Sequence, residues 1–176
     1  MITPNSLLPQ RPANLLLFAM LASALALALA FISEYGFHLH PCQMCYWQRI
    51  PYAVIIVAGA MSWLLRSRFP AFLRVTLWLI LLLFATNAGL SGFHAGVEWR
   101  WWEGPGACSG GIDGNMSLEE IRAKLLGAAS VSCSDAAVRV AGLSMAGWNM
   151  LYSLACGIVV LLGLNMQRRK TDGSPQ

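Results

Sequence analysis

The chain has 176 residues, of which 57% are hydrophobic and only 11% are charged, and its mean hydropathy is +0.57. Soluble domains carry about 25% charged residues, so this composition excludes an ordinary soluble protein and also a disordered chain. A soluble nucleic-acid binder would display its basic charge on one face, which a net charge of +4 in so apolar a chain does not suggest. An apolar helix of about 20 residues crosses a bilayer, so the length suits a small helical membrane protein with four or five such helices.

The first predicted element is a transmembrane helix over residues 13–32, a run of 20 residues without a charge. A cleaved signal peptide is the alternative, because Arg11 precedes the run and the Ala-Leu repeats near its end resemble a cleavage site. The apolar region of a signal peptide usually has only about 7–15 residues. The length of the run therefore favours a retained span.

Three further apolar runs predict the remaining spans. Residues 45–65 contain a single charge, Arg49, close to the start of the run, and residues 75–92 and 140–166 contain none. Four spans place both termini on the same side of the membrane. The predicted fold is an all-α membrane protein, a four-transmembrane-helix bundle that forms one integral membrane domain over residues 1–176.

The positions of the charges predict the orientation of these spans. Seven basic residues lie before the first span, between the second and third, or after the fourth: Arg11, Arg66, Arg68, Arg74, Arg168, Arg169 and Lys170. Seven of the eight acidic residues lie in the other two loops, residues 33–44 and 93–139. Because cytoplasmic loops carry an excess of Lys and Arg, we expect cytoplasmic termini and two outer loops.

The second outer loop has two parts of different character. Residues 104–115 are rich in glycine without an apolar period, which predicts a mobile loop. Residues 117–127 predict a short helix, because Ser117 and Glu120 form a capping box at its start. One apolar stripe follows along this helix: Leu118, Ile121, Leu125 and Leu126. Such a helix lies on the membrane surface or packs on the ends of the spans.

The chain contains five cysteines: Cys42, Cys45, Cys108, Cys133 and Cys156. The predicted orientation places four of them in the two outer loops or at the membrane edge of these loops, where disulfide bonds persist. Cys156 falls in the middle of the fourth span, and a small buried apolar residue is its simplest interpretation. Four cysteines allow three pairings, and spacing favours Cys42 with Cys45 and Cys108 with Cys133.

Cys42 and Cys45 form a C-x-x-C motif where the chain starts a helix. The first helical turn brings the two sulfurs together, and the helix N-terminus favours a thiolate, so this spacing suits a redox pair. A structural disulfide or half of a zinc site is the alternative. Zinc requires a second close pair or histidine ligands. Cys108 and Cys133 are separated by 24 residues, and His38 and His40 are the only nearby imidazoles. We therefore predict no metal.

Arg49 is the second chemical signal, because a charge just inside a span is costly. It lies four residues beyond Cys45 and therefore on the same side of the helix, one turn below. A cation there stabilises a Cys45 thiolate and an anionic partner beside it. The alternative is an arginine that reaches out to the lipid headgroups. His94, at the outer end of the third span, is the histidine that another helix could bring to this place.

Together these features resemble a known family. They are the segment HPCQMCYWQR (His40 to Arg49), the four spans, the long outer loop with one cysteine pair, and the segment FHAGVEW (Phe93 to Trp99). The chain resembles, over nearly its whole length, the DsbB family of bacterial quinone-dependent disulfide oxidoreductases. The C-x-x-C motif alone would be weak evidence, whereas Pro-Cys-x-x-Cys followed by Arg in this topology is specific.

The resemblance implies a relay of disulfide exchange in the bacterial inner membrane. A reduced periplasmic oxidant of the DsbA type, with a thioredoxin fold, attacks a disulfide between Cys108 and Cys133 and becomes bonded to Cys108. The released Cys133 then attacks Cys42, which leaves Cys45 as a thiolate. The electrons pass from Cys45 to ubiquinone or menaquinone, and the resemblance places Arg49 at this quinone site, with His94 as a further candidate.

Two other functions fit parts of the pattern. Proteins similar to vitamin K epoxide reductase share four helices, a C-x-x-C motif and a quinone, but they carry the motif late in the chain, whereas here it follows the first span. A non-catalytic four-helix scaffold or transporter subunit would use the two loop disulfides only for structure. Such a scaffold would tolerate replacement of Cys45, whereas the enzyme would lose quinone reduction.

Overall fold

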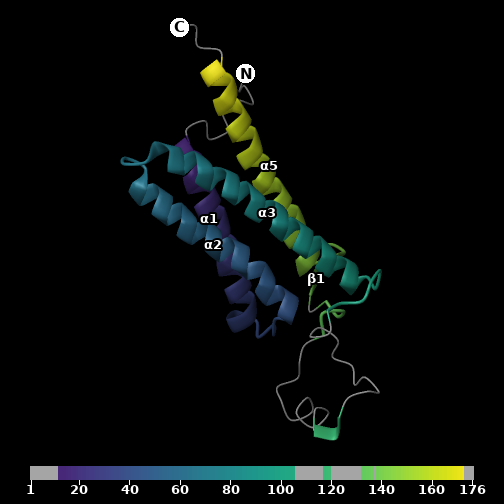
Figure 1. Cartoon of the computed structure of the whole chain (residues 1–176). Helices are drawn as coiled ribbons and strands as arrows, with labels where there is room; N and C mark the ends of the chain where they lie inside the picture. Colours follow the sequence, from purple (N-terminus) through teal and green to yellow (C-terminus); the bar gives the residue numbers. More distant parts are fainter. Residues whose placement is uncertain (1–11, 106–116, 120–131, 137, 173–176) are drawn as a thin grey trace.

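Four long helices make up most of the protein (Figure 1). The computed structural model describes residues 12–105, 117–119, 132–136 and 138–172. The helices are α1 (Pro12–Phe31), α2 (Gln43–Leu65), α3 (Pro70–Glu98) and α5 (Met145–Asp172). Each contains a segment long and apolar enough to cross a membrane. The predicted four-helix membrane bundle is therefore confirmed.

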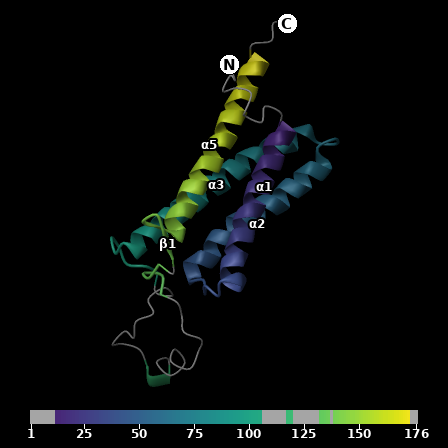
Figure 2. The same cartoon turned by 180° about the vertical axis from the view of Figure 1, so that it is seen from behind.

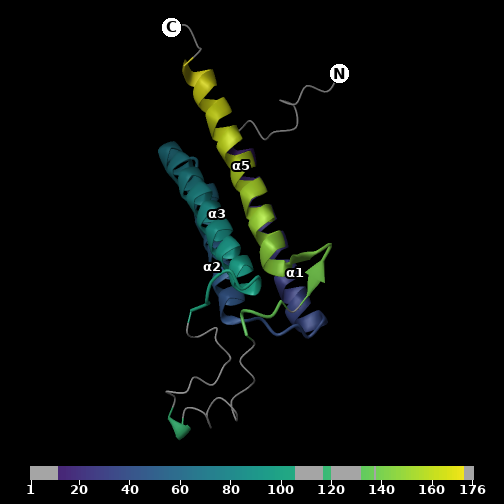
Figure 3. The same cartoon turned by 90° about the vertical axis from the view of Figure 1, so that its right-hand side faces the viewer.

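Successive helices run in alternating directions, so that α1 begins and α5 ends at one end of the bundle (Figures 1 and 2). At the opposite end, α2 begins and α3 ends. In the side view, α3 and α5 lie next to one another and a small hairpin lies at the start of α5, near the end of α1 (Figure 3). This second end therefore gathers residues from all four helices.

The core consists of apolar side chains contributed by every helix. Its buried members are Leu15, Leu16, Ala19, Tyr52, Ile55, Leu77, Ile80, Phe84, Cys156, Val160 and Leu164. Three of these residues come from α1, which therefore packs as part of the bundle. Cys156 is buried among them, which confirms its interpretation as a small apolar core residue.

Two helices differ from the predicted spans at their ends. Helix α3 begins before residue 75 and ends beyond residue 92. At its C-terminal end, His94 and Glu98 are buried by protein, so these polar residues continue the helix. Helix α5 begins later than residue 140 and continues past residue 166. The sequence prediction ended each span at the first charged or polar residue. In the structure, the helices end where the backbone turns.

The late start of α5 results from a β-hairpin that the apolar pattern conceals. Strands β1 (Arg139–Val140) and β2 (Leu143–Ser144) pair antiparallel. The two residues between them, Ala141 and Gly142, have φ values of 51° and 82°, as a tight hairpin turn requires. The apolar side chains of this segment extended the predicted fourth span into the hairpin.

The first loop begins with a short helical turn. Helix α1 continues directly into η2 (Ile32–Gly36), a π-helical turn, before the chain reaches Cys42 at the start of α2. The predicted Gly-rich loop over residues 104–115 and the predicted short helix over 117–127 lie largely outside the described residues.

Candidate active site

The C-x-x-C motif occupies the start of α2. Cys42 is the N-cap residue, with extended backbone angles, and its sulfur accepts a hydrogen bond from the Cys45 amide at 3.4 Å. Because the first helical turn separates the two residues, their sulfurs lie 3.0 Å apart. Both are free thiols in this structure. The helix therefore brings the two sulfurs together as the spacing predicts, here in the reduced form.

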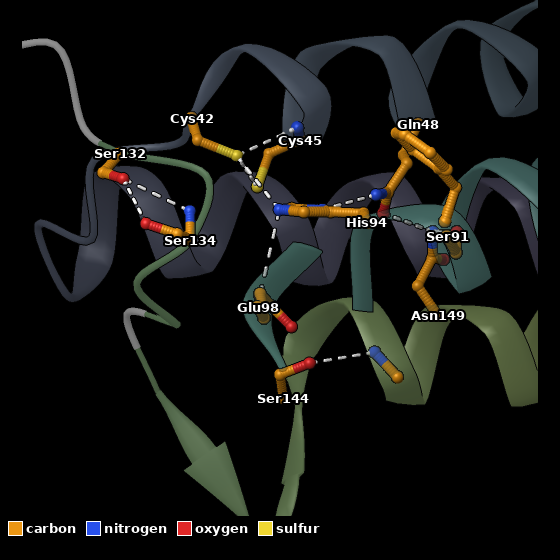
Figure 4. Close-up of polar contacts among 12 residues, drawn as sticks. Cys42, Cys45, Gln48, Ser91, His94, Glu98, Ser132, Ser134, Ser144 and Asn149 are labelled. Carbon is orange, nitrogen blue, oxygen red and sulfur yellow. Dashed lines mark hydrogen bonds and ion pairs between the residues drawn. The ribbon is translucent and has the colours of Figure 1, made fainter. Parts of the chain in front are cut away.

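His94 on α3 lies directly beside this pair (Figure 4). Its side chain is almost fully buried, and its Nε2 atom lies 3.4 Å from Cys42 Sγ. On the other side, Nε2 is 3.8 Å from a carboxylate oxygen of Glu98, one turn further along α3. The ring therefore bridges the cysteine pair and a buried acid.

Cys133 brings the second outer loop to the same place. It is 1% exposed and packs against Cys42, Met44 and Val97. Its sulfur lies within 4.8 Å of both Cys42 Sγ and a ring nitrogen of His94. Cys133 is disulfide-bonded, and Cys108, its predicted partner, lies outside the described residues. A disulfide sulfur is thus positioned next to a free thiol.

The same three residues have a spacing that could also suit a metal ion. The candidate donor atoms of Cys42, His94 and Cys133 all lie within 4.8 Å of one another. A sulfur engaged in a disulfide is not a thiolate, however, and metal ligation by cysteine requires the thiolate. Disulfide exchange also needs two sulfurs close together, and the positions of Cys42 and Cys133 meet that requirement.

The environment of Cys42 favours its thiolate. The pKa of Cys42 is lowered to about 4, chiefly by a hydrogen bond from the Cys45 thiol and also by the hydrogen bond of His94. Burial opposes both effects, because it disfavours the charged form. Since the lowering contributions prevail, the reduced pair carries its negative charge on Cys42.

Arg49 is held by residues near the end of α1. Its guanidinium forms an ion pair with Glu34 at 2.5 Å, and both side chains are 15% exposed. The guanidinium also lies over the rings of Phe31 and Tyr46, and the Tyr46 hydroxyl donates a hydrogen bond to Glu34. The first loop therefore fixes Arg49 in place, which the sequence alone did not indicate.

A cavity of about 550 Å³ connects these groups. Cys45, Arg49 and His94 all line it, so the structure brings the predicted site residues of α2 and α3 to one space. The remaining wall is mainly apolar: Ala26, Leu27, Leu29, Ala30, Leu39, Pro41, Val140, Met145, Ala146 and Trp148. Small-molecule sites have this size and this mixture of apolar walls with a few polar groups.

Several residues at the site escaped the sequence analysis. Gln48 Nε2 lies 2.7 Å from His94 Nδ1, and Asn149 donates a hydrogen bond to Gln48 Oε1 at 2.9 Å (Figure 4). Glu34 and Glu98 supply the carboxylates beside Arg49 and His94. The sequence does contain one signal for these residues: they are polar side chains in or next to apolar spans. A buried polar side chain requires a hydrogen-bonding partner.

Comparison with known proteins identifies one family and two similar chains. A family model described as "Disulfide bond formation protein DsbB" matches residues 11–163. An uncharacterized protein of Rickettsia prowazekii (strain Madrid E), RP370, is 30% identical over 153 residues, which cover 86% of this chain and 84% of the relative. Disulfide bond formation protein B of Xylella fastidiosa (strain 9a5c) is 28% identical over 149 residues, 82% of this chain and 85% of the relative.

Proposed function

Because the chain belongs to the DsbB family of disulfide bond formation proteins, we propose that it reoxidises a periplasmic thiol oxidant of the DsbA type and passes the electrons to a membrane quinone. One observation carries this proposal. The sulfur of the disulfide-bonded Cys133 lies within 4.8 Å of Cys42, whose own sulfur is 3.0 Å from Cys45. Three sulfurs thus form a continuous path from the outer loop to the cavity.

The relay begins at the outer disulfide, which we assign to Cys108 and Cys133. A thiolate of the reduced partner attacks Cys108, and Cys133 leaves as a thiolate. Cys133 then attacks Cys42 of the oxidised inner pair, and Cys45 leaves. Each step forms one S–S bond and breaks another, and the second thiol of the partner closes its own disulfide when it releases Cys108. The partner has then lost two electrons to the protein.

In the proposed cycle, the described arrangement of the cysteines would come after this transfer. Cys133 is again disulfide-bonded, whereas Cys42 and Cys45 are both free, so two electrons reside on the inner pair. The return of Cys108 to Cys133 releases Cys42 and produces this arrangement. Formation of the Cys42–Cys45 disulfide then removes two electrons and two protons, which a quinone accepts when it becomes a quinol.

The cavity beside Cys45 suits a quinone, whether ubiquinone or menaquinone. Its apolar walls from α1 and α5 fit a ring and the start of an isoprenoid chain. Arg49 would hold a polar oxygen of the quinone, since it lines the cavity and can donate hydrogen bonds. His94 lines the same cavity next to Cys42 and would face the quinone from there.

We further propose that the protein lies in the bacterial inner membrane with both termini in the cytoplasm. Arg66 and Arg68 follow α2 at the end of the bundle opposite Cys42 and the hairpin (Figure 1). Positive charges concentrate on the cytoplasmic side of membrane proteins. The Cys42 end therefore faces the periplasm, where an oxidant of the DsbA type can reach it.

The decisive experiment mixes the detergent-purified protein anaerobically with ubiquinone and a reduced DsbA-type partner, and follows the quinone absorbance. We expect catalytic loss of the quinone and formation of the partner's disulfide in equal amounts. A parallel reaction with menaquinone distinguishes the two acceptors. If a folded protein reduces neither quinone, the enzymatic proposal is wrong and a scaffold with structural disulfides replaces it.

Replacement of Arg49 by alanine is expected to weaken quinone use, raising the KM for quinone by about tenfold, because a hydrogen bond to a polar oxygen and a favourable charge are lost. The rate of disulfide exchange with the partner should change little. Arg66→Ala is the matched control, since Arg66 contacts Trp63 at the other end of the same helix. Unchanged quinone kinetics in Arg49→Ala would remove Arg49 from the quinone site.

A further inference from the structure

A series of polar side chains runs through the bundle and ends at Cys42. Its members come from three helices: Tyr52 and Gln48 on α2, Asn87 and His94 on α3, and Ser153 and Asn149 on α5. All except the half-buried Asn149 are buried. Apolar spans seldom contain so many polar groups, and each must find a partner inside the protein.

The direction of the first hydrogen bonds follows from the donors available. Asn87 Nδ2 donates to Ser153 Oγ at 3.2 Å. The Tyr52 hydroxyl donates to Asn149 Oδ1 at 2.6 Å, so its one proton is already used. In the contact of 2.8 Å between Tyr52 and Ser153, the Ser153 hydroxyl is therefore the donor and the Tyr52 oxygen the acceptor. Each hydroxyl thus accepts one bond and donates the next.

The next bonds continue in the same direction towards His94. Asn149 uses its oxygen for Tyr52, so its amide nitrogen donates to Gln48 Oε1 at 2.9 Å and to Ser91 Oγ at 2.7 Å. Because the Gln48 oxygen is an acceptor, its nitrogen is the atom that faces His94 Nδ1. An amide nitrogen can only donate. His94 Nδ1 is therefore unprotonated, and the ring proton lies on Nε2.

We propose that this hydrogen-bond chain is a positioning device, in which Gln48 and Asn149 hold His94 as the Nε2–H tautomer so that it donates to Cys42. The Nε2 proton then points at a sulfur 3.4 Å away and stabilises it as a thiolate. Bonds aligned head to tail polarise one another and strengthen the last one.

The role of this thiolate rests on the proposed function. Closing the inner disulfide requires an unprotonated sulfur on one cysteine while the other gives up its electrons. A Cys42 thiolate, 3.0 Å from Cys45, meets that requirement without a separate base. Gln48 and Asn149 act only through His94, so they are positioning residues and not catalytic ones.

Other titratable and charged groups could influence Cys42 and must be held constant. Those that share its cavity are His40, Cys45, Arg49, Tyr52, His94, Glu98, Asp135 and Tyr152. Cys133 also packs against it, as a disulfide sulfur. Variants at Gln48 and Asn149 change none of these charges. They therefore isolate the effect of the hydrogen-bond chain.

Nitrogen NMR of protein labelled with ¹⁵N-histidine tests the tautomer directly, and the chain has only three histidines. We expect the unliganded native protein to show a His94 signal with unprotonated Nδ1 and protonated Nε2. In Gln48→Met and in Asn149→Leu, we expect signals from a mixture of His94 tautomers. Asn149 acts on the ring indirectly, through its hydrogen bond to Gln48. Ser62→Ala is the matched control, because Ser62 is buried in α2 without a hydrogen-bond partner.

A second measurement follows alkylation of Cys42 in the reduced protein as a function of pH. At acidic pH we expect both variants to react about tenfold more slowly, as loss of a hydrogen bond to a charged group predicts, while Ser62→Ala reacts like the native protein. Protonated Nδ1 in the native protein, or variants with unchanged spectra and profiles, would overturn the proposal. Neither measurement uses quinone or partner, so failure of the proposed function would leave both results interpretable.

Discussion

Replacement of Cys45 by serine is expected to abolish quinone reduction completely, because the hydroxyl cannot form the inner disulfide or deliver its two electrons. The variant should fold normally, since the Cys45 backbone amide, which binds Cys42 Sγ, remains in place. Quinone absorbance, followed anaerobically with the reduced partner present, measures the loss. A serine hydroxyl is close in size to the thiol, so the cavity wall keeps its shape.

Cys156→Ala provides the matched control for that experiment. Cys156 is the third free thiol of the described residues and lies buried in the core of the bundle. We expect this variant to reduce quinone at the native rate with a small loss of stability. If Cys45→Ser retained quinone reduction, electrons would leave the protein from another sulfur, and the assignment of Cys45 to the cavity side would be wrong.

Replacement of Cys133 by serine is expected to separate the two halves of the reaction. Oxidation of the partner protein should be lost, because no outer disulfide can form and the sulfur that lies next to Cys42 is missing. A small dithiol such as dithiothreitol should still reduce the inner pair directly, since Cys45 lines the cavity and is partly exposed. Quinone reduction driven by dithiothreitol should therefore persist while reduction driven by the partner stops.

The two electron donors, the partner protein and dithiothreitol, should therefore give opposite results with Cys133→Ser. Chemical quenching with an alkylating agent, followed by mass analysis, shows which thiols are free in the variant. Continued oxidation of the partner by Cys133→Ser would mean that the partner attacks the inner pair itself. Loss of both reactions would instead give Cys133 a structural role, in keeping with its packing against Met44 and Val97.

The apolar runs predicted the four helices, because a single apolar segment that crosses the bilayer satisfies its backbone hydrogen bonds by forming a helix. They did not predict the helix ends. His94 and Glu98 continue α3 since other protein groups bury them, and Val140 falls in a hairpin although its side chain suits a span. Composition reveals which segments enter the membrane, but turns in the backbone decide where each helix begins.

The candidate site was predictable where its chemistry is local. The C-x-x-C spacing at a helix start brings two sulfurs together, and the structure shows this contact. The partners of Arg49 and His94 depend on which helix faces meet, and a single sequence does not contain that information. Glu34 on η2 pairs with Arg49 on α2, and Gln48 on α2 contacts His94 on α3. These contacts arise from tertiary packing alone.

The β-hairpin at the start of α5 has a kinetic consequence for the proposed relay. It lies only a few residues after Cys133 in the chain and leads directly into α5, and the Cys133 sulfur lies within 4.8 Å of Cys42. Groups held in this way react with effective molarities far above any concentration of free protein. The exchange between Cys133 and Cys42 is then first order and independent of enzyme concentration, so turnover at low partner concentration is set by how often the partner arrives.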